Sequence, residues 1–504
     1  MANRARSFAV LLAVAAAALT GCTDDATDPA PPSSTTTIDA AARLTVMEFN
    51  IEYGGELVDF DAIPRAIREV DADVVALEEA YGNTAKVARA LDWPYYDARL
   101  QLVSRLPLLQ PPDANGLYTL IEIEPGRVAA IGNVHLPSSP YGPRKVRLGM
   151  SAQETLELEE RVRIPAVEPF LEALGGVADE MPAFLVGDFN APSHRDWTEE
   201  TAGTRDFVEF PLDWPVSRAV EQAGFVDSFR AVYPDPVQDP GITWPSGRPD
   251  IEGEWNPGPK APPDRIDFIY AAGSATVTES TLVGEKGGEG VDVSVSPWPT
   301  DHRALVSSFD IEPGSPPTMI SVDHQLVRSD ENVALRWSAP AAGETQISIE
   351  GEEGVAPFDG GAAGSRDLPA ADLGPGAYEA VLWANGSELA RAPFWVAEPG
   401  APPEVGTTEP SYEVGDPITV EWGNAPANRW DWIGLYKRDA DPDIAYYLSY
   451  LYTEATVAGS VTFDDENGVG KWPLEPSKYT VYILIDDSYE EIAGSDFVVT
   501  RAGS

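Results

Sequence analysis

Apolar runs that end in polar residues recur six times between residues 46 and 306. The runs are VMEFN (46–50), VVALEEA (74–80), IGNVHLP (131–137), FLVGDFNAPSH (184–194), DRIDFIY (264–270) and PTDHRALV (299–306). Each run is typical of a buried strand that delivers one or two polar groups to its end. Acids, amides and histidines at successive strand ends are the way an α/β scaffold builds one active site from distant sequence.

Helical patterns lie between these predicted strands. They cover residues 61–70, 85–91, 151–163 and 166–174. The stretch 235–264 repeats Pro, Gly and Asp, which predicts a long loop beside the site. The alternation of strands and helices predicts one layered α/β (α+β) domain over residues 43–312.

The pattern changes after this domain to short alternating strands with Gly and Pro turns. Residues 318–398 contain VALRW, TQISIE, YEAVLWA and APFWVA, and a Pro-rich stretch separates them from a second segment of this kind, residues 406–500. Both segments are predicted to be β-sandwich modules.

The N-terminus reads as a targeting segment. Arg4 and Arg6 precede an apolar run over residues 8–19, which is too short to span a membrane and has the flanks of a signal peptide, residues 1–21. Residues 22–42 are rich in Asp, Pro, Ser and Thr, which predicts a disordered tether.

The sequence Leu19-Thr20-Gly21-Cys22 resembles the lipobox of bacterial lipoproteins. The resemblance implies cleavage before Cys22, acylation of that cysteine and anchoring to the outside of the bacterial cell membrane. An ordinary secretory signal with an incidental cysteine is the alternative. Cys22 is the only cysteine, so its lipidation would leave no thiol for a disulfide, and its place makes it a poor catalytic nucleophile.

The composition limits the classes of partner. The chain of 504 residues is long enough for several domains, and its 43% apolar content is that of a globular protein. It carries 82 acidic and 34 basic side chains, a net charge of −48. This balance opposes general nucleic-acid binding, which needs basic surface, and suits an extracellular setting.

The six motifs, taken in order, resemble the endonuclease/exonuclease/phosphatase superfamily over about residues 43–310. GDFN and DHR, with NVHL upstream of both, carry the resemblance. The superfamily includes type I deoxyribonucleases, apurinic endonucleases, sphingomyelinases and inositol polyphosphate 5-phosphatases. The resemblance implies a four-layer sandwich of two packed β-sheets flanked by helices. It also implies a divalent cation, usually Mg²⁺, with Mn²⁺ as the alternative.

Asn50 and Glu79 are the candidate metal ligands closest to the N-terminus. Hydrolysis of a phosphate ester needs a cation to neutralise charge, and Mg²⁺ prefers carboxylate and amide oxygens. Glu79 matches the metal-binding Glu of the superfamily, although Glu78 replaces the Gln that usually precedes it. Alternation along a strand places Glu78 and Glu79 on opposite faces, so that only one, which we expect to be Glu79, reaches the metal.

The other motif residues match positions to which the superfamily gives roles. By resemblance these are Asp188 (polarises the attacking water), Asn190 and His135 (hold phosphate oxygens), Asp301 (binds metal), His302 (stabilises phosphate charge or assists proton transfer) and Asp267 (orients His302). A lone GDFN is often a structural turn whose Asp caps a helix. The apolar strand before it and the other motifs favour the catalytic interpretation.

Four basic residues are candidates for substrate binding. Arg105 lies in a Ser-Arg-Leu-Pro sequence that resembles a superfamily element near the site. Arg144, Lys145 and Arg147 cluster after His135 and could clamp an anionic substrate, although such clusters are often only solvated.

These observations predict a Mg²⁺-dependent phosphoric ester hydrolase, either a phosphodiesterase, a phosphatase or a nuclease, at the bacterial cell surface. We expect a monomer held by its lipid anchor, with a small molecule, a phospholipid head group or nucleic acid as substrate. Residues 411–499 resemble SKICH-like modules through Tyr412, GDPI, DWIGLY and FVV, which favours phospholipids. The alternative is a binding or adhesion lipoprotein whose β-sandwich modules act and whose catalytic domain is degenerate.

Overall fold

The computed structural model describes residues 41–501 except 112–113, 254–255, 259–260, 340–342, 352–354 and 443–444. The contacts group Ala41–Ser504 into one unit. The predicted signal peptide, Cys22 and all but the last two residues of the predicted tether lie outside the described residues. Within the described part, no helix is long and apolar enough to cross a membrane.

A seven-stranded sheet carries the first two motifs and the last one. Its strand order is β12-β11-β13-β1-β2-β4-β3. The bounds are β1 (Ala42–Asn50), β2 (Val74–Glu78), β3 (Tyr95–Asp97), β4 (Leu102–Ser104), β11 (Ala275–Gly284), β12 (Val293–Ser294) and β13 (Ala304–Ile311). The central strand β1 runs parallel to β2 and antiparallel to β13.

A six-stranded sheet carries the three remaining motifs, in the strand order β5-β6-β7-β8-β10-β9. The bounds are β5 (Leu108–Leu109), β6 (Thr119–Glu124), β7 (Arg127–His135), β8 (Ala183–Asp188), β9 (Val226–Asp227) and β10 (Asp267–Ala272). β8 runs parallel to β7 and antiparallel to β10. The register pairs both His135 and Asp267 with Asp188.

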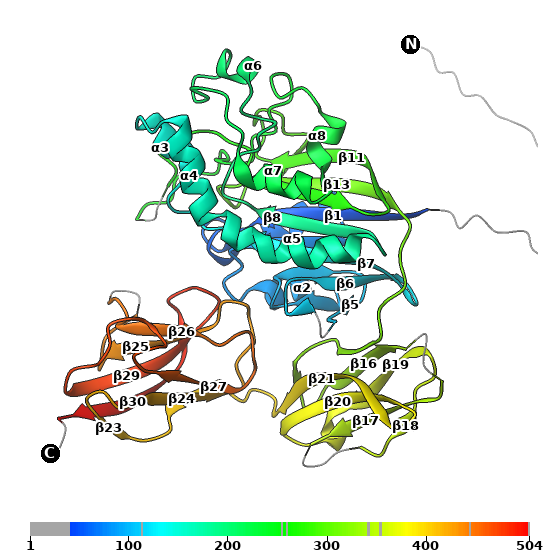
Figure 1. Ribbon diagram of the computed structural model, residues 1–504, viewed down its shortest axis with the longest axis vertical. Helices are drawn as coiled ribbons and strands as arrows, with labels where there is room; N and C mark the ends of the chain where they lie inside the picture. Colours follow the sequence, from blue (N-terminus) through cyan, green and yellow to red (C-terminus); the bar gives the residue numbers. More distant parts are fainter. Residues whose placement is uncertain are drawn as a thin grey trace, which may run out of the picture. The chain divides into compact units, whose positions relative to one another are not determined.

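The two sheets pack face to face, and helices cover their outer faces. The helices are α1 (Ala62–Glu69), α2 (Thr84–Leu91), α3 (Gly142–Arg147), α4 (Ala152–Val162), α5 (Ile164–Ala178), α6 (Glu199–Ala202), α7 (Pro215–Gln222) and α8 (Ser228–Val232). α1 and α2 contribute to the core on the outside of the seven-stranded sheet. α5 and α7 contribute to the core on the outside of the six-stranded sheet, where α5 packs along β8 (Figure 1).

The core between the sheets takes apolar side chains from strands of both. Val46 and Val74 come from the seven-stranded sheet, and Phe184, Val186 and Ile269 come from the six-stranded sheet. Strands buried on both sides read as continuous apolar runs, which is why the motifs could be recognised. The predicted mixed α+β class, with two packed sheets and flanking helices, is confirmed.

The predicted helices lie within a few residues of the observed ones. For α4 the local cause is visible, because the Ser151 side chain accepts from the Glu154 N–H while the Glu154 side chain accepts from the Ser151 N–H. Within the described part of 235–264 no helix or strand forms, and one isolated bridge joins Trp244 to Asp264.

The C-terminal third of the chain consists of β-strands, as expected for β-sandwich modules. One pair of sheets has the orders β14-β16-β19 and β15-β21-β20-β17-β18. Their bounds are β14 (Met319–Val322), β15 (Leu326–Arg328), β16 (Asn332–Ser338), β17 (Thr345–Glu350), β18 (Phe358–Asp359), β19 (Ala363–Pro369), β20 (Gly376–Ala384) and β21 (Ser387–Ala397). Apolar side chains from both sheets form its core.

The last pair of sheets has the orders β22-β24-β27 and β23-β30-β29-β25-β26-β28 and a core of its own. The bounds are β22 (Glu404–Thr407), β23 (Ser411–Glu413), β24 (Ile418–Gly423), β25 (Trp432–Lys437), β26 (Ser449–Tyr452), β27 (Gly459–Phe463), β28 (Val469–Gly470), β29 (Ser477–Leu484) and β30 (Glu491–Thr500). We call this pair of sheets the C-terminal sandwich.

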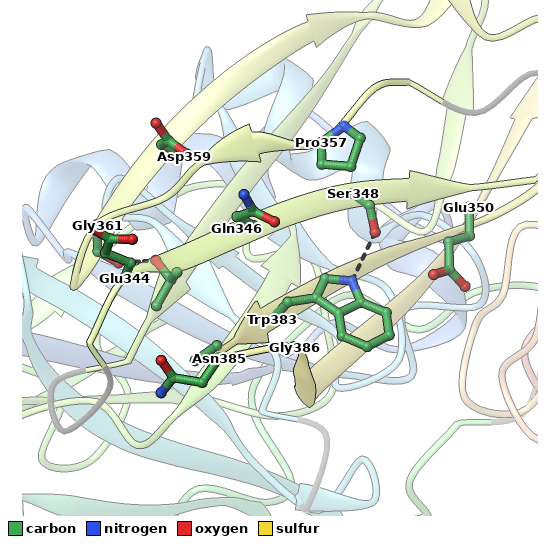
Figure 2. A pocket seen from close by; sticks show the side chains of 12 residues that line it. Glu344, Gln346, Ser348, Glu350, Pro357, Asp359, Gly361, Trp383, Asn385 and Gly386 are labelled. Atoms are coloured by element: carbon green, nitrogen blue, oxygen red, sulfur yellow. Dashed lines mark hydrogen bonds between the residues drawn. The ribbon is translucent and has the colours of Figure 1, made fainter.

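A groove of about 820 Å³ lies on the sandwich that precedes it (Figure 2). Trp383 stands on β20 opposite Gln346 of β17, and its indole N–H donates to the Ser348 hydroxyl at 3.0 Å. Glu350 and Asp359 also line the groove, and its described lining contains no Lys or Arg. This composition does not suit a phosphate group.

Candidate active site

Three motif residues meet where adjacent strands of the six-stranded sheet end or begin. β7 ends at His135, β8 ends at Asp188 and β10 begins at Asp267. Because β7 is parallel and β10 antiparallel to β8, all three positions fall at the same edge of the sheet. β1 of the other sheet ends at Asn50, whose side-chain amide reaches the Asp188 carboxylate.

The Asp188 carboxylate is buried and held by amides. Its Oδ1 accepts the backbone N–H of Asn190 at 2.7 Å. Its Oδ2 accepts from the side-chain amides of Asn50 and Asn190, both at 3.2 Å. Burial, with a contribution from the charge of Asp267, raises the pKa of Asp188 to about 6. A carboxylate fixed in this way, with a raised pKa, is suited to accept a proton from water.

His302 is paired with Asp267. Its Nδ1 lies 3.1 Å from both carboxylate oxygens of Asp267. Its Nε2 lies 3.8 Å from Asp188 Oδ2 and 3.9 Å from Asp301 Oδ1. Burial opposes the charged form, but the surrounding carboxylates outweigh it and hold the pKa of His302 well above its usual range. His302 is therefore an imidazolium that directs one N–H toward the site.

His135 lies on the other side of Asp188. Its Nε2 is 3.7 Å from Asp188 Oδ2. Burial lowers the pKa of His135, so that its neutral form dominates. Neutral His135 and charged His302 thus flank the same carboxylate. Because their charges differ, the two imidazoles can play different chemical roles.

Glu79 and Asp301 carry the carboxylate oxygens best suited to a cation. Glu79 follows β2 with a φ of 52°, a turn that directs the chain into the cleft. Its oxygens have only long contacts, 3.4 Å to the Asn50 amide and 3.4 Å to the Tyr53 N–H. Asp301 Oδ2 accepts from the Trp244 indole at 2.9 Å, while Oδ1 has His302 Nε2 at 3.9 Å. The Glu79 oxygens and Asp301 Oδ1, which have only long contacts among the described residues, fit an oxygen-coordinated divalent cation.

A second possible metal group consists of Asp188, Asp267 and His302, whose ligand atoms all lie within 4.8 Å of one another. The two groups cannot be equally good. In the second group, His302 Nδ1 and the Asp267 carboxylate are already committed to each other at 3.1 Å. We therefore favour Glu79 and Asp301, with the Asn50 amide beside them.

Glu78 and Glu79 take the opposite positions that strand alternation predicts. Glu79 lines the cleft, whereas Glu78 ends β2 fully buried beside Glu48 of β1. Among the described residues, no other group donates to the carboxyl oxygens of Glu48 and Glu78, and the two side chains hydrogen-bond to each other. Burial holds the pKa of both groups well above the usual range, so this buried pair retains a proton.

The site opens into a cleft of about 1080 Å³. Its lining combines the site residues with basic and aromatic side chains: His135, Asp188, Asn190, Glu79, Asp301, His302, Arg144, Lys145, Tyr53, Tyr81, Tyr141, Trp244 and Asp487 are among them. Arg144 and Lys145 come from α3 and are exposed to solvent. The structure therefore places two members of the predicted basic cluster beside the candidate catalytic groups.

Arg105 and Arg147, the other two predicted substrate-binding residues, are not among the residues that line the cleft. Arg105 Nη1 pairs with Asp71 Oδ1 at 2.6 Å, and its guanidinium lies 5.1 Å from the centre of the Trp93 ring. These partners hold Arg105 away from the cleft lining. Arg147 is exposed at the last position of α3 and is not among the residues that line the cleft.

Asn133 and His194, two other polar residues within the motifs, have structural partners. Asn133 donates to the carbonyls of Leu77 at 2.8 Å and Leu100 at 3.0 Å, and so ties one sheet to the other. His194 Nδ1 lies 2.8 Å from the Ser217 hydroxyl, and its ring is not part of the cleft lining.

Sequence reasoning missed the role of Arg248. It forms a two-bond ion pair with Glu52, with both nitrogen–oxygen distances 2.6 Å. Glu52 Oε2 also accepts the Asp301 backbone N–H at 2.9 Å, so the pair fixes the segment that carries Asp301 and His302. Arg248 lies in the predicted loop, where nothing in the sequence marked its partner.

Comparison with known proteins places this site in a family. A sequence model described as "Endonuclease/Exonuclease/phosphatase family" matches residues 47–302, about half of the 504-residue chain. The chain belongs to this family. Membership of the endonuclease/exonuclease/phosphatase family indicates a phosphoric ester hydrolase that depends on a divalent metal, and the acids at the cleft provide a possible site for that metal.

The chain is also similar to individual members of the family. It is 28% identical over 303 residues to "Uncharacterized protein F14F9.5" of Caenorhabditis elegans, covering 55% of this chain and 94% of the relative. A humanized D. rerio TDP2 structure shares 16% identity with a TM-score of 0.32, covering 53% of this chain and 98% of that one. The Bacteroides thetaiotaomicron mannosyl-6-phosphatase Bt3783 shares 14% identity with a TM-score of 0.30, covering 53% and 99%. At such values the two structural similarities carry no argument about function.

Proposed function

We propose that the protein is a Mg²⁺-dependent phosphoesterase, exported and anchored by a lipid at Cys22. The proposed catalytic activity rests on one observation: two kinds of carboxylate, with different hydrogen-bond partners, line the same cleft. Asp188 is held by amides between two histidines, and Glu79 and Asp301 have oxygens left for a cation. When bound, the cation would supply charge neutralisation at the phosphate.

The residues of the chain supply the rest of the chemistry. Asp188 orients a water molecule and accepts its proton as the water attacks phosphorus in line with the leaving oxygen. The His302 imidazolium, kept charged by Asp267, donates an N–H to a phosphate oxygen. His135 and Asn190 also line the cleft. Donors fixed before the reaction stabilise the developing charge without reorganisation.

The substrate that we propose is a small phosphoester or a phospholipid head group. Arg144 and Lys145 supply positive charge at the cleft, but the chain as a whole carries a net charge of −48. A nuclease that follows a long polyanion would need a continuous basic surface. Binding of the C-terminal sandwich to membranes, as a SKICH-like module, is part of the same proposal and favours a lipid.

Hydrolysis of bis-p-nitrophenyl phosphate tests the proposed chemistry. We expect turnover with Mg²⁺ or Mn²⁺, loss of turnover with EDTA, and a fall in kcat of about 10²- to 10⁴-fold for Asp188→Asn, the usual contribution of a positioned base. Asp310→Asn, an exposed carboxylate of β13, is the matched control and should keep full activity. Wild-type protein with no metal-dependent turnover would instead favour the binding lipoprotein.

The proposed location has its own test. Wild-type protein expressed in a bacterial host should sediment with membranes and carry acyl chains at its N-terminus, detected by mass spectrometry. Cys22→Ser should release it, because an unmodified hydroxyl cannot receive the anchor. Soluble, unacylated wild-type protein would refute the lipid anchor and leave the hydrolase proposal standing.

A further inference from the structure

A loop of the C-terminal sandwich contributes to the wall of the active-site cleft. The loop follows β29 and places Asp487 in the same lining as Asp188 and His302. Asp487 lies 299 positions after Asp188 in the sequence. The family match ends at residue 302, so this acid does not belong to the matched segment.

Asp486 fixes this loop to the segment that follows the candidate metal ligand Glu79. The fully buried Asp486 carboxylate accepts the Gly82 N–H at 2.9 Å. It also accepts the Gln101 amide at 3.0 and 2.9 Å. Gly82 has a φ of +80°, and a Cβ there would lie 2.2 Å from Ile485 Cδ1. Glycine at position 82 accommodates both this positive φ and the close contact of its backbone with Ile485.

A second contact holds the C-terminal sandwich beside β7. The Arg429 guanidinium donates to the Asn133 carbonyl at 3.1 Å. It also lies 5.0 Å from the centre of the Phe170 ring on α5. Arg429 is thereby occupied with partners behind His135 and is not part of the cleft lining. The contacts of Asp486 and Arg429 therefore attach the C-terminal sandwich at two separate places and limit how far the loop with Asp487 can move.

Asp487 itself is exposed to the cleft and lacks a cationic partner among the described residues. Its Oδ1 accepts the Tyr452 hydroxyl at 3.2 Å. Partial desolvation raises the pKa of Asp487, and the Tyr452 hydrogen bond only partly opposes this effect. A carboxylate in this condition would gain from a positive group brought by a ligand.

Two tyrosines accompany Asp487 in the lining. The rings of Tyr53 and Tyr81 meet edge to face with their centres 5.5 Å apart. Asp487 and both tyrosines line the same cleft. Aromatic faces attract organic ammonium groups, and a nearby carboxylate adds to that attraction. The cleft therefore combines a phosphate-binding centre with an aromatic and acidic corner that suits a cation.

We propose that Asp487, Tyr53 and Tyr81 form a subsite for an organic ammonium group, so that the preferred substrate is a phosphoester whose alcohol carries an amine or quaternary ammonium. This inference rests on the proposed phosphoesterase function and specifies its substrate class. It gives the C-terminal sandwich a direct part in substrate selection. Asp487 is then a specificity-determining residue that touches the part of the substrate outside the phosphate.

The test compares two diesters of p-nitrophenyl phosphate that differ in one charge. In one the second alcohol is choline, and in the other it is 3,3-dimethylbutanol, an uncharged isostere. With the full mature chain and Mg²⁺ or Mn²⁺, we expect kcat/KM to favour the choline ester by about tenfold, the scale of one cation–π contact with a charge partner. Equal values for the two esters would overturn the proposal.

Variants locate the effect. Asp487→Asn and Tyr81→Leu should each raise KM for the choline ester severalfold and leave the dimethylbutyl ester unchanged. Glu490→Gln, an exposed acid six residues after β29 ends and outside the cleft lining, should change neither. A loss of activity that is equal for both esters would overturn the subsite, because it would show a structural role for Asp487.

Binding separates failure of this inference from failure of the proposed function. If neither ester is hydrolysed, the phosphoesterase proposal fails. Calorimetry with phosphorylcholine and with inorganic phosphate then decides the subsite alone. Tighter binding of phosphorylcholine that Asp487→Asn abolishes would support it, and equal binding of the two would overturn it.

Discussion

Replacing Asp267 tests the paired arrangement at the centre of the site. Asp267 is fully buried, and its two carboxylate oxygens both lie 3.1 Å from His302 Nδ1. Asp267→Asn keeps an oxygen that can accept this N–H but removes the charge that favours the imidazolium. Asp267→Ala removes both the charge and the acceptor. The two variants therefore separate the electrostatic part of the interaction from the orienting part.

The magnitudes follow from ordinary hydrogen-bond energies. A hydrogen bond to a charged group contributes about 1.5–3 kcal/mol and a neutral one about 0.5–1.5 kcal/mol. Loss of the charge alone then costs roughly 1–1.5 kcal/mol, and each 1.36 kcal/mol in the barrier is about tenfold in rate. We expect kcat to fall roughly tenfold for Asp267→Asn and about 10- to 100-fold for Asp267→Ala. KM should change little, because the interaction strengthens as phosphate charge develops.

Initial rates on bis-p-nitrophenyl phosphate at saturating Mg²⁺ measure both parameters. Circular dichroism and thermal unfolding should show that each variant is folded, since a buried carboxylate is being replaced. Asp310→Asn supplies the control for a lost surface charge. If both Asp267 variants are folded and keep kcat within about twofold, then His302 does not depend on Asp267 and the assigned roles are wrong.

Three further predictions address the rest of the domain. Arg144→Gln with Lys145→Gln should raise KM about tenfold, the loss of one or two charge-assisted bonds, while Arg147→Gln should leave KM unchanged in the same assay. Gly187→Ala should lower the unfolding free energy by roughly 2–4 kcal/mol in urea titration, because its Cβ would lie 1.9 Å from a carbonyl oxygen of β7. The pKa of Asp486 is raised from 3.8 to about 6, so the folded state binds this proton more tightly than the unfolded state. The protonated Asp486 carboxyl therefore stabilises the folded state fully below about pH 4, and this contribution is lost as the pH rises through 6. The fall in Tm from pH 4 to pH 7 should be smaller for Asp486→Asn than for wild type.

The strand-end residues could be predicted because short-range patterns determine them. An apolar run of four to six residues specifies a buried strand, and period-two alternation is enough to separate Glu79 from Glu78. His135, Asp188, Asp267 and His302 each follow such a run or precede one. The family resemblance implied two packed sheets, and the structure adds the strand order that brings these strand ends together.

The residues that could not be predicted depend on partners far away in the sequence. Arg105 has a motif context, but Asp71 and the Trp93 ring decide where its guanidinium lies. Arg248 pairs with Glu52 across 196 positions, within a stretch that reads only as loop. Asp487 reaches the cleft through the packing of a separate module, and no local pattern encodes that packing.

The distribution of charge around the cleft gives the strongest physical reason to expect a cation there. Asp188, Asp267, Glu79 and Asp301 all act electrostatically on His302 or are acted on by it. Arg248 forms its two carboxylate hydrogen bonds with Glu52, and its charge also acts on Asp301. Burial is the main cause of the raised pKa values of Glu79 and Asp188, and the charges of Asp301 and Asp267 add to it. Glu79 and Asp301 would hold a divalent cation whose charge would offset part of this negative charge, and Asp188 and His302 would act on water and phosphate.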